Sequence, residues 1–346
     1  MHILHALFTH THGGLGQAHV NTTEALIYKG HKVTALMHKD SPYCEKITAL
    51  GAEIHTLQPR GFYDLIAAWK IRCLLKQLRP DLIIAHNARA IALLSFAARG
   101  TNIQVCGVTH SYKTPRTTHA DMLVVLSDHM RKHFVQAGYK KPIEVIPNFI
   151  HLPENPLSRP TRGRVREGGL VIGAIGRFTI EKGFDIFIRA LGILKQSGTN
   201  FTARLGGDGE ERAKLETLAN ELKLTAHIQW DGWIKNQPEF YRKIDILCVP
   251  SREESFPLVV LEALSYGLPM VASDAPGPAS ILTHGVDGLI VPRENPEAMA
   301  AALKQLAENP GMAERVSNAA WQRAQDFGFE AVAKKWDKFI SSCKTR

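Results

Sequence analysis

Short apolar runs alternate with amphipathic helical stretches along almost all of this 346-residue chain. Such alternation is typical of parallel α/β domains, in which each strand is followed by a helix that packs on the sheet. Strands are expected at residues 2–8, 31–37, 53–56, 81–85, 103–108, 122–126, 143–146, 170–176, 201–206, 227–230, 245–249, 269–272 and 288–291. Helices are expected at 17–29, 62–79, 183–196, 209–222, 237–242, 258–266, 296–308, 311–326 and 329–342. The pattern therefore predicts an α/β fold built on parallel sheets.

A polar stretch at residues 151–168 divides this pattern into two halves. It contains Pro156, Pro160 and several arginines and offers little to bury, so it is interpreted as a linker. A chain of this length is also too long for one comfortable core. We therefore expect two Rossmann-like domains, at 1–165 and 166–328, followed by a last helix.

The net charge of +9 is unevenly placed. Residues 1–165 carry 20 Lys and Arg against 10 Asp and Glu, whereas the rest carries 22 against 23. Such asymmetry suggests a partner for the first half, although solubility alone is the simpler explanation. Nucleic acid is a weaker candidate, because the basic residues are dispersed and no binding module is present.

Helix 62–79 stands out in the basic half, because it mixes aromatic and leucine side chains with four cations. Basic amphipathic helices can lie on anionic membrane surfaces, so this helix is a candidate for peripheral membrane contact. The alternative is a core-packed helix with a solvated basic edge.

Other features indicate a cytoplasmic protein. No segment has the apolar length of a membrane span, and the first residues resemble a strand more than a signal peptide. The five cysteines are scattered and form no Cys-x-x-Cys pair, which suits a reducing compartment.

Two glutamates, Glu254 and Glu262, form the most informative motif. Glu254 follows a buried strand, and Glu262 lies about one turn into a helix that begins near Pro257. Both can then face the crevice in which open parallel sheets bind ligands. Two carboxylates there would repel each other unless they accept hydrogen bonds from hydroxyls, such as those of ribose and a sugar. The alternative is a solvated helix start, where the helix dipole favours glutamate.

Two cations, Arg177 and Lys182, stand five residues apart in a glycine-bracketed loop between a strand and a helix that begins near Phe184. Cations at a helix amino terminus form a strong site for a diphosphate. The alternative is a surface ion pair between Arg177 and Glu181.

Glycines end several strands. Gly14 and Gly16 lie in a loop before helix 17–29, where backbone amides can approach a phosphate, although they also suit a plain tight turn. They begin a dinucleotide-binding fingerprint, but His19 occupies its third glycine position, which argues against nicotinamide binding. Gly207 belongs to a similar loop, for which a capped turn is an equal alternative. The backbone around Trp233, at another strand end, could meet a nucleobase.

His110 follows a strand in the basic half, where its ring can hydrogen-bond a ligand; an ordinary loop histidine is the alternative. The histidines show no metal-binding spacing, and no Asp-x-Asp is present for a diphosphate bridged by Mg²⁺ or Mn²⁺. We therefore expect no metal, and phosphate charge would have to be neutralised by Arg177, Lys182 and backbone amides.

Together these residues resemble glycosyltransferase family 4, which has the GT-B fold. The resemblance covers nearly the whole chain and implies two doubly wound domains that face each other across a deep cleft, with the last helix at 329–346 crossing back to the first domain. The landmarks, in order, are Gly13-Gly14, Thr109-His110, Ile146-Pro147-Asn148, Gly176-Arg177, Glu181-Lys182-Gly183, Gly207-Asp208-Gly209 and Glu254 to Glu262.

The resemblance also implies roles for the candidate residues. Glu262 would accept the ribose hydroxyls and Glu254 would face the donor sugar. Arg177 and Lys182 would bind the diphosphate, and His110 would touch the sugar from the acceptor side. Further contacts to the nucleotide-sugar are implied for Gly14, Gly16, Gly207, Trp233, Phe256 and Leu258. Family members often have glycine at the position of Pro257, and since proline has no N–H, one amide contact is lost.

The activity implied is retaining, metal-independent transfer of a hexose from a nucleotide-sugar, with UDP-sugars the commonest donors. A lipid-linked or cell-envelope glycan, such as lipopolysaccharide, is the expected acceptor. Two alternatives are a nucleotide-sugar epimerase, which needs no acceptor, and a non-catalytic nucleotide-sugar-binding or membrane-adaptor protein. The intact set of Glu254, Glu262, Arg177 and Lys182 argues against the non-catalytic alternative. A dehydrogenase is the most remote possibility.

Overall fold

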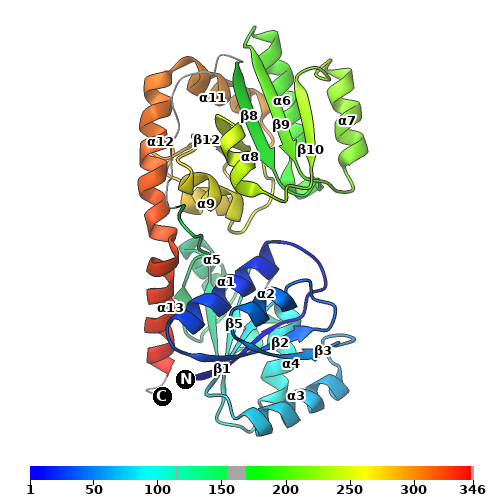
Figure 1. Ribbon diagram of the computed structural model, residues 1–346, viewed down its shortest axis with the longest axis vertical. Helices are drawn as coiled ribbons and strands as arrows, with labels where there is room; N and C mark the ends of the chain where they lie inside the picture. Colours follow the sequence, from blue (N-terminus) through cyan, green and yellow to red (C-terminus); the bar gives the residue numbers. More distant parts are fainter. Residues whose placement is uncertain (114–115, 154–168, 344–346) are drawn as a thin grey trace. The chain divides into compact units, whose positions relative to one another are not determined.

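The computed structural model describes residues 1–113, 116–153 and 169–343 (Figure 1). The chain forms two compact units: Met1–Phe149 together with Gly328–Arg346, and Ile150–Phe327. The domain boundary expected after residue 165 and most of the expected linker lie outside the described residues.

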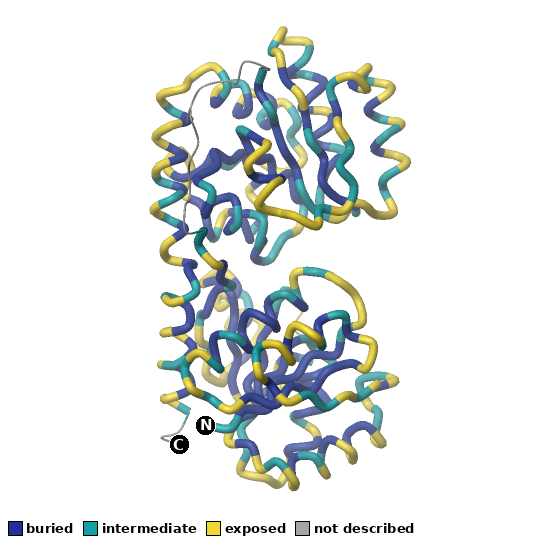
Figure 2. Tube along the Cα trace, viewed as in Figure 1, coloured by how far each residue is buried: buried dark blue, intermediate teal, exposed yellow. Residues whose placement is uncertain are grey.

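The first unit is a seven-stranded parallel sheet in the order β3-β2-β1-β4-β5-β6-β7. Its strands are β1 (His2–Leu7), β2 (Lys32–His38), β3 (Glu53–Leu57), β4 (Leu82–His86), β5 (Gln104–Val108), β6 (Met122–Val125) and β7 (Ile143–Val145). Its α-helices are α1 (Gly14–Tyr28), α2 (Cys44–Ala49), α3 (Leu65–Leu78), α4 (Ala88–Ala97), α5 (Asp128–Gln136) and α13 (Phe329–Cys343). The central strands are buried on both faces, which explains their continuous apolar sequences (Figure 2).

The last helix, α13, belongs to the first unit, as the family resemblance implies. Val332, Trp336 and Ile340 recur at helical spacing along its buried stripe and join the core of that unit. At its start, the Phe329 ring lies 4.9 Å from that of Tyr28 on α1. The expectation that this helix returns to the first domain is therefore confirmed.

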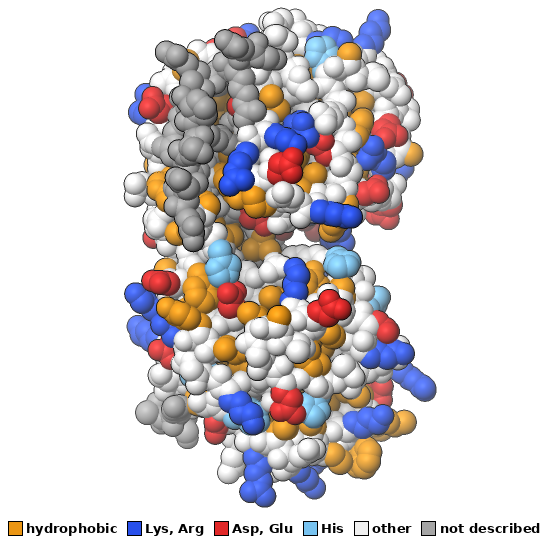
Figure 3. All heavy atoms as spheres, in the orientation of Figure 1, with side chains coloured by type: hydrophobic (Ala, Val, Ile, Leu, Met, Phe, Trp, Pro, Cys, Tyr) orange, Lys and Arg blue, Asp and Glu red, His pale blue; other side chains and the backbone are white. Residues whose placement is uncertain are grey.

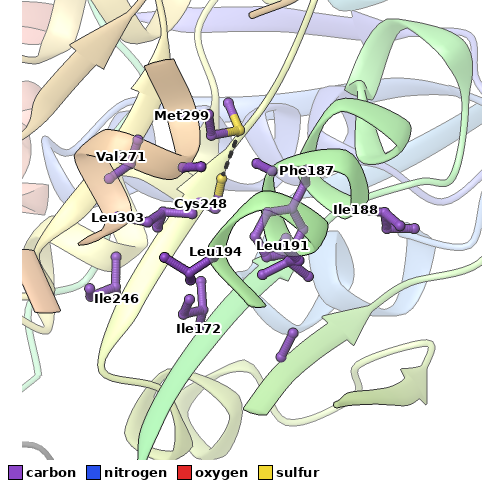
Figure 4. Packing of buried hydrophobic residues seen from close by; sticks show 14 of the residues in the cluster. Ile172, Phe187, Ile188, Leu191, Leu194, Ile246, Cys248, Val271, Met299 and Leu303 are labelled. Carbon is purple, nitrogen blue, oxygen red and sulfur yellow. Dashed lines mark hydrogen bonds between the residues drawn. The ribbon is translucent and has the colours of Figure 1, made fainter. Parts of the chain in front are cut away.

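The second unit is a six-stranded parallel sheet in the order β10-β9-β8-β11-β12-β13. Its strands are β8 (Leu170–Ile175), β9 (Phe201–Gly206), β10 (Ile228–Gly232), β11 (Ile246–Val249), β12 (Met270–Ser273) and β13 (Leu289–Val291). Its α-helices are α6 (Phe184–Gln196), α7 (Arg212–Glu221), α8 (Gln237–Lys243), α9 (Leu258–Ser265), α10 (Pro276–Ile281), α11 (Pro296–Glu308) and α12 (Pro310–Ala324). Figure 4 shows how Phe187, Leu191 and Leu194 of α6 pack toward Ile172 of β8.

Local signals start several helices of the second unit. The Asn295 side chain accepts a hydrogen bond of 2.8 Å from the amide of Ala298, and Pro296 occupies the first turn of α11. Asn309 caps α12 in the same way. These asparagine–proline pairs mark the starts of α11, which packs on β12 and β13, and of α12, which packs on α9 and α11.

Two sequence expectations need correction. Helix α1 begins at Gly14 and not at residue 17, so Gly14 and Gly16 lie in its first turn. The helices α2, α4, α5 and α10 were not expected; in α10, two of the six residues are proline and one is glycine, which disfavours a helix. In the described part of the chain, no helix is both long and apolar enough to cross a membrane.

Candidate active site

The second sheet reverses its strand order between β8 and β11. In open parallel sheets, ligands bind outside the carboxyl ends of the strands at such a switch point. Strand β8 ends at Ile175 and β11 at Val249, so the loops that follow them border this crevice. The first loop carries Arg177 and Lys182, and the second carries Glu254.

Lys182 and Glu254 meet at this point. The Lys182 Nζ donates a hydrogen bond to Oε2 of Glu254 in a close ion pair. The side chains are only 26% and 15% exposed, so water screens the two charges less than it would on an open surface. The fold thus brings two of the predicted residues, which are 72 positions apart, into one site.

Arg252 joins the two loops, a role that was not predicted from the sequence. Its amide donates a hydrogen bond of 2.8 Å to the Glu181 carbonyl. Its guanidinium binds both carboxylate oxygens of Asp185, at 2.7 and 2.8 Å, and donates to the Ile180 carbonyl. Burial alone would raise the pKa of Asp185, but the hydrogen bonds and charge of Arg252 hold that pKa below its ordinary value. The fork-shaped pairing fixes the position of Lys182 relative to Glu254.

Arg177 lies exposed in the same loop as Lys182. No ion pair joins it to Glu181 within the described residues, so the surface-pair alternative does not describe this structure. The backbone N–H of Glu181 is instead the largest cause that lowers the pKa of the Glu181 carboxyl. The Arg177 guanidinium is therefore available to an anionic ligand.

Glu262 lies in α9, half-buried, and receives a hydrogen bond of 2.6 Å from the Tyr241 hydroxyl to its Oε2. Burial raises the pKa of Glu262, and the bond from Tyr241 partly opposes this shift. Its other oxygen, Oε1, makes no hydrogen bond to the described part of the chain and can accept one from a ligand. Tyr241, on α8, was not identified from the sequence, since nothing in the local pattern links it to Glu262.

Helix α9 presents its amino terminus near the same edge. Leu258 is its first residue, and the amides of a first helical turn have no partner inside the helix. The Phe256 side chain is 7% exposed and its ring lies 6.0 Å from that of Phe327, so only the backbone of Phe256 can face a ligand. Pro257 occupies the capping position and supplies no N–H.

Gly277 of α10 supports the loop that carries Glu254. Its amide donates a hydrogen bond of 2.8 Å to the Glu254 carbonyl. A Cβ at this position would lie 2.8 Å from the same carbonyl oxygen, so only glycine allows the approach. This contact was not expected, because α10 itself was not.

Gly207 and Trp233 have different surroundings. The Gly207 amide donates a hydrogen bond of 2.6 Å to the Gly232 carbonyl, and a Cβ on Gly207 would lie 1.8 Å from the Gly176 carbonyl oxygen. The glycine is thus needed for loop packing, and its N–H is already used within the protein. Trp233 is 55% exposed at the end of β10.

In the first unit, His110 follows β5 and its Nε2 lies 2.9 Å from Nδ1 of His86. Gly14 is exposed at the start of α1, which leaves its backbone accessible. Gly16 is buried, and a Cβ there would lie 2.1 Å from the Tyr43 ring. Gly16 therefore serves close packing.

Within the described residues, no group of three or more His, Cys, Asp or Glu side chains could hold a metal ion.

Comparisons with known proteins identify the class. Two family models match neighbouring parts of the chain, Glycosyltransferase Family 4 at residues 12–153 and Glycosyl transferases group 1 at residues 160–323. The lipopolysaccharide core biosynthesis glycosyltransferase LpsD of Rhizobium meliloti (strain 1021) is 30% identical over 320 residues, which cover 92% of this chain and 91% of that protein.

Solved structures share the fold. Alr3699/HepE of Anabaena, in complex with UDP, matches with a TM-score of 0.87 at 20% identity, over 99% of this chain and 100% of that chain. The same protein has also been solved with UDP-glucose. The lipopolysaccharide outer core galactosyltransferase WaaB in its apo form matches with a TM-score of 0.81 at 16% identity, over 99% of both chains.

Fold and sequence together define a glycosyltransferase of the GT-B type. Within that class, the chain belongs to glycosyltransferase family 4. The expected fold class and enzyme class are therefore confirmed.

Proposed function

We propose that this enzyme transfers a hexose from a UDP-sugar to a lipid-linked or cell-envelope glycan, with retention of configuration and without a divalent metal. The observation that carries the proposal is the contact between Lys182 and Glu254 at the switch point of the second sheet. It joins a cation suited to a diphosphate to a carboxylate suited to sugar hydroxyls within one site.

The remaining donor contacts follow from the same geometry. Arg177, which is exposed and without an ion pair in the described residues, adds a second cation for the diphosphate. As the bond to the sugar breaks, negative charge develops on the departing UDP, and positioned cations stabilise it. Oε1 of Glu262 accepts hydrogen bonds from the ribose, while the Leu258 amide at the start of α9 adds a donor.

The choice of substrates rests on the relatives. UDP and UDP-glucose are the ligands described for Alr3699/HepE, which supports a UDP-sugar as the donor. LpsD and WaaB are described as lipopolysaccharide core enzymes, which supports an envelope glycan as the acceptor.

A thermal-shift screen with UDP-, GDP-, ADP- and dTDP-sugars tests the donor. We expect only a UDP-sugar to raise the melting temperature, because a ligand stabilises the state that binds it. Product analysis of that donor without acceptor then separates the activities: a transferase leaves the sugar unchanged, whereas an epimerase releases an altered nucleotide-sugar. Stabilisation by another nucleotide-sugar alone would contradict the proposed donor.

We also propose that the first unit rests on an anionic membrane at its cytoplasmic face. One face of α3 packs against the rest of the first unit through four buried side chains: Ala67, Ala68, Ile71 and Leu75. At the other face and at the helix start, however, four large hydrophobic side chains are 64–78% exposed: Tyr63, Leu65, Ile66 and Trp69. Figure 3 shows hydrophobic side chains beside Lys and Arg at the lower edge of the molecule, where Figure 1 places α3.

The composition of this exposed face favours a bilayer over plain solvent. Aromatic and aliphatic side chains can enter the interfacial layer, while neighbouring cations such as Lys70 and Lys76 meet anionic headgroups. A cavity of about 540 Å³, lined in part by Tyr63, Leu65 and Phe96, opens beside them.

Sedimentation with vesicles tests this contact. The wild type should bind vesicles that contain phosphatidylglycerol several-fold better than vesicles of phosphatidylcholine alone, and salt should weaken the binding. Trp69→Ser should reduce recovery, whereas Trp233→Ser, which removes a tryptophan that is also more than half exposed but belongs to the other unit, should not. Equal recovery with both kinds of vesicle would remove the membrane proposal and leave the proposed chemistry untouched.

A further inference from the structure

Four histidines of the first unit form a continuous cluster. His5 on β1 stacks on His19 of α1 with ring centroids 4.0 Å apart. The His5 ring also contacts His86 at the end of β4, at 4.8 Å, and His86 stacks on His110 at 5.1 Å. His5, His19 and His86 are fully buried, whereas His110 is partly accessible. The cluster thus runs from the core to a residue at the carboxyl edge of the sheet.

All four rings are neutral near physiological pH. Burial lowers the pKa of His19 to about 3 and that of His110 to about 4, and it holds the pKa values of His5 and His86 well below the ordinary value. A neutral imidazole has one N–H donor and one bare acceptor nitrogen. The chemistry that each ring can offer therefore depends on which nitrogen carries the proton.

The tautomer of His5 follows from its neighbour. The Thr23 hydroxyl donates its hydrogen to the His19 carbonyl at 3.0 Å, so it must accept the bond that joins it to Nδ1 of His5 at 2.8 Å. His5 therefore carries its proton on Nδ1. Its buried Nε2, which has no partner in the described residues, is then a bare acceptor.

A similar argument gives the direction of the hydrogen bond between His86 and His110. Nδ1 of His86 lies 2.9 Å from Nε2 of His110, and one of the two must donate. If His110 donated, the proton of His86 would sit on Nε2, which is buried and has no partner in the described residues. An orphaned buried N–H is rarer than an under-satisfied acceptor. His86 is therefore the donor, and the proton of His110 is on Nδ1.

We propose that His86 is a positioning residue that fixes His110 as the Nδ1–H tautomer, so that His110 offers a hydrogen-bond donor to an oxygen of a sugar at the carboxyl edge of the first sheet. Nδ1 of His110 makes no hydrogen bond to the described part of the chain. It is also not among the fully buried side-chain atoms that lack a partner there, so it is accessible to a ligand. The identity of the ligand as a sugar rests on the proposed transferase function, but the tautomer of His110 does not.

Nitrogen NMR of protein labelled with ¹⁵N-histidine tests the tautomer directly. Near neutral pH, Nδ1 of His110 should have the shift of a protonated ring nitrogen and Nε2 that of a bare one, with the signals assigned by their loss in His110→Gln. A proton on Nε2, or a doubly protonated ring, would overturn the inference. This measurement needs neither substrate nor a variant of His86.

Kinetics test the consequence for the sugar. His86→Leu removes the bond to His110, whereas His19→Leu makes the same chemical change in the same cluster without touching that bond. We expect kcat of His86→Leu to fall about tenfold below that of His19→Leu, as for one lost hydrogen bond, with equal affinity for UDP in both. Equal kcat values would overturn the positioning role, while an inactive wild type would instead count against the proposed function.

Discussion

Replacing Lys182 with alanine is expected to lower kcat/KM for the UDP-sugar about hundredfold. A hydrogen bond to a charged group contributes about 1.5–3 kcal/mol, and each 1.4 kcal/mol or so is tenfold. The effect should lie toward the upper end, because the variant also leaves Glu254 without its partner and places an uncompensated carboxylate beside the diphosphate. Steady-state rates of UDP release from the donor measure the change.

Lys214→Ala is the matched control for this loss of charge. Lys214 belongs to the same unit, is 72% exposed and forms a surface ion pair with Glu211. Surface pairs contribute little, so its kinetics should stay within about twofold of the wild type. Similar losses in the two variants would mean that overall charge, and not the position of Lys182, controls the reaction.

Replacing Glu262 with glutamine is expected to change binding and stability in opposite directions. The variant should bind UDP about tenfold to hundredfold more weakly, since a neutral amide oxygen is a poorer acceptor for ribose hydroxyls than a carboxylate. At neutral pH it should nevertheless melt at a higher temperature, because it removes a charge from a half-buried position where desolvation disfavours the ionised form. Glutamine can still accept the hydrogen bond from Tyr241, so this contact is retained.

The pH dependence of this stabilisation follows from the raised pKa of Glu262. Below 4.5, its ordinary value, the carboxyl is protonated in both the folded and the unfolded protein, and the two melting temperatures should coincide. As the pH rises through the folded-state pKa, the wild type ionises the half-buried carboxyl of Glu262 and loses stability that the variant keeps. Melting curves across this pH range measure the difference in melting temperature between Glu262→Gln and the wild type. If that difference were the same at acid and neutral pH, ionisation of Glu262 would not be its cause.

The pattern of apolar runs was sufficient to predict both sheets, because buried parallel strands must be almost wholly apolar whatever their partners are. It also placed Lys182 and Glu254 at strand ends. The start of α1 was misjudged because Gly13 and Gly14 weaken a helical pattern, while close packing of Gly16 against Tyr43 overrides their low propensity.

The residues that sequence reasoning missed act across long distances in the chain. Arg252 pairs with Asp185 over 67 positions, and Tyr241 reaches Glu262 from another helix. The sequence shows that each of these residues is polar, but only the three-dimensional arrangement shows that they are in contact. His86 was not identified from the sequence, because its contact with His110 depends on the pairing of β4 with β5.

Calorimetric titration of UDP tests most directly the claim that the switch point of the second sheet binds the nucleotide. The account predicts measurable UDP affinity in the wild type, a loss of about tenfold or more in Lys182→Ala and in Glu262→Gln, and no loss in Glu308→Gln, an exposed glutamate on α11 of the same unit. Unchanged UDP affinity in both site variants would contradict it.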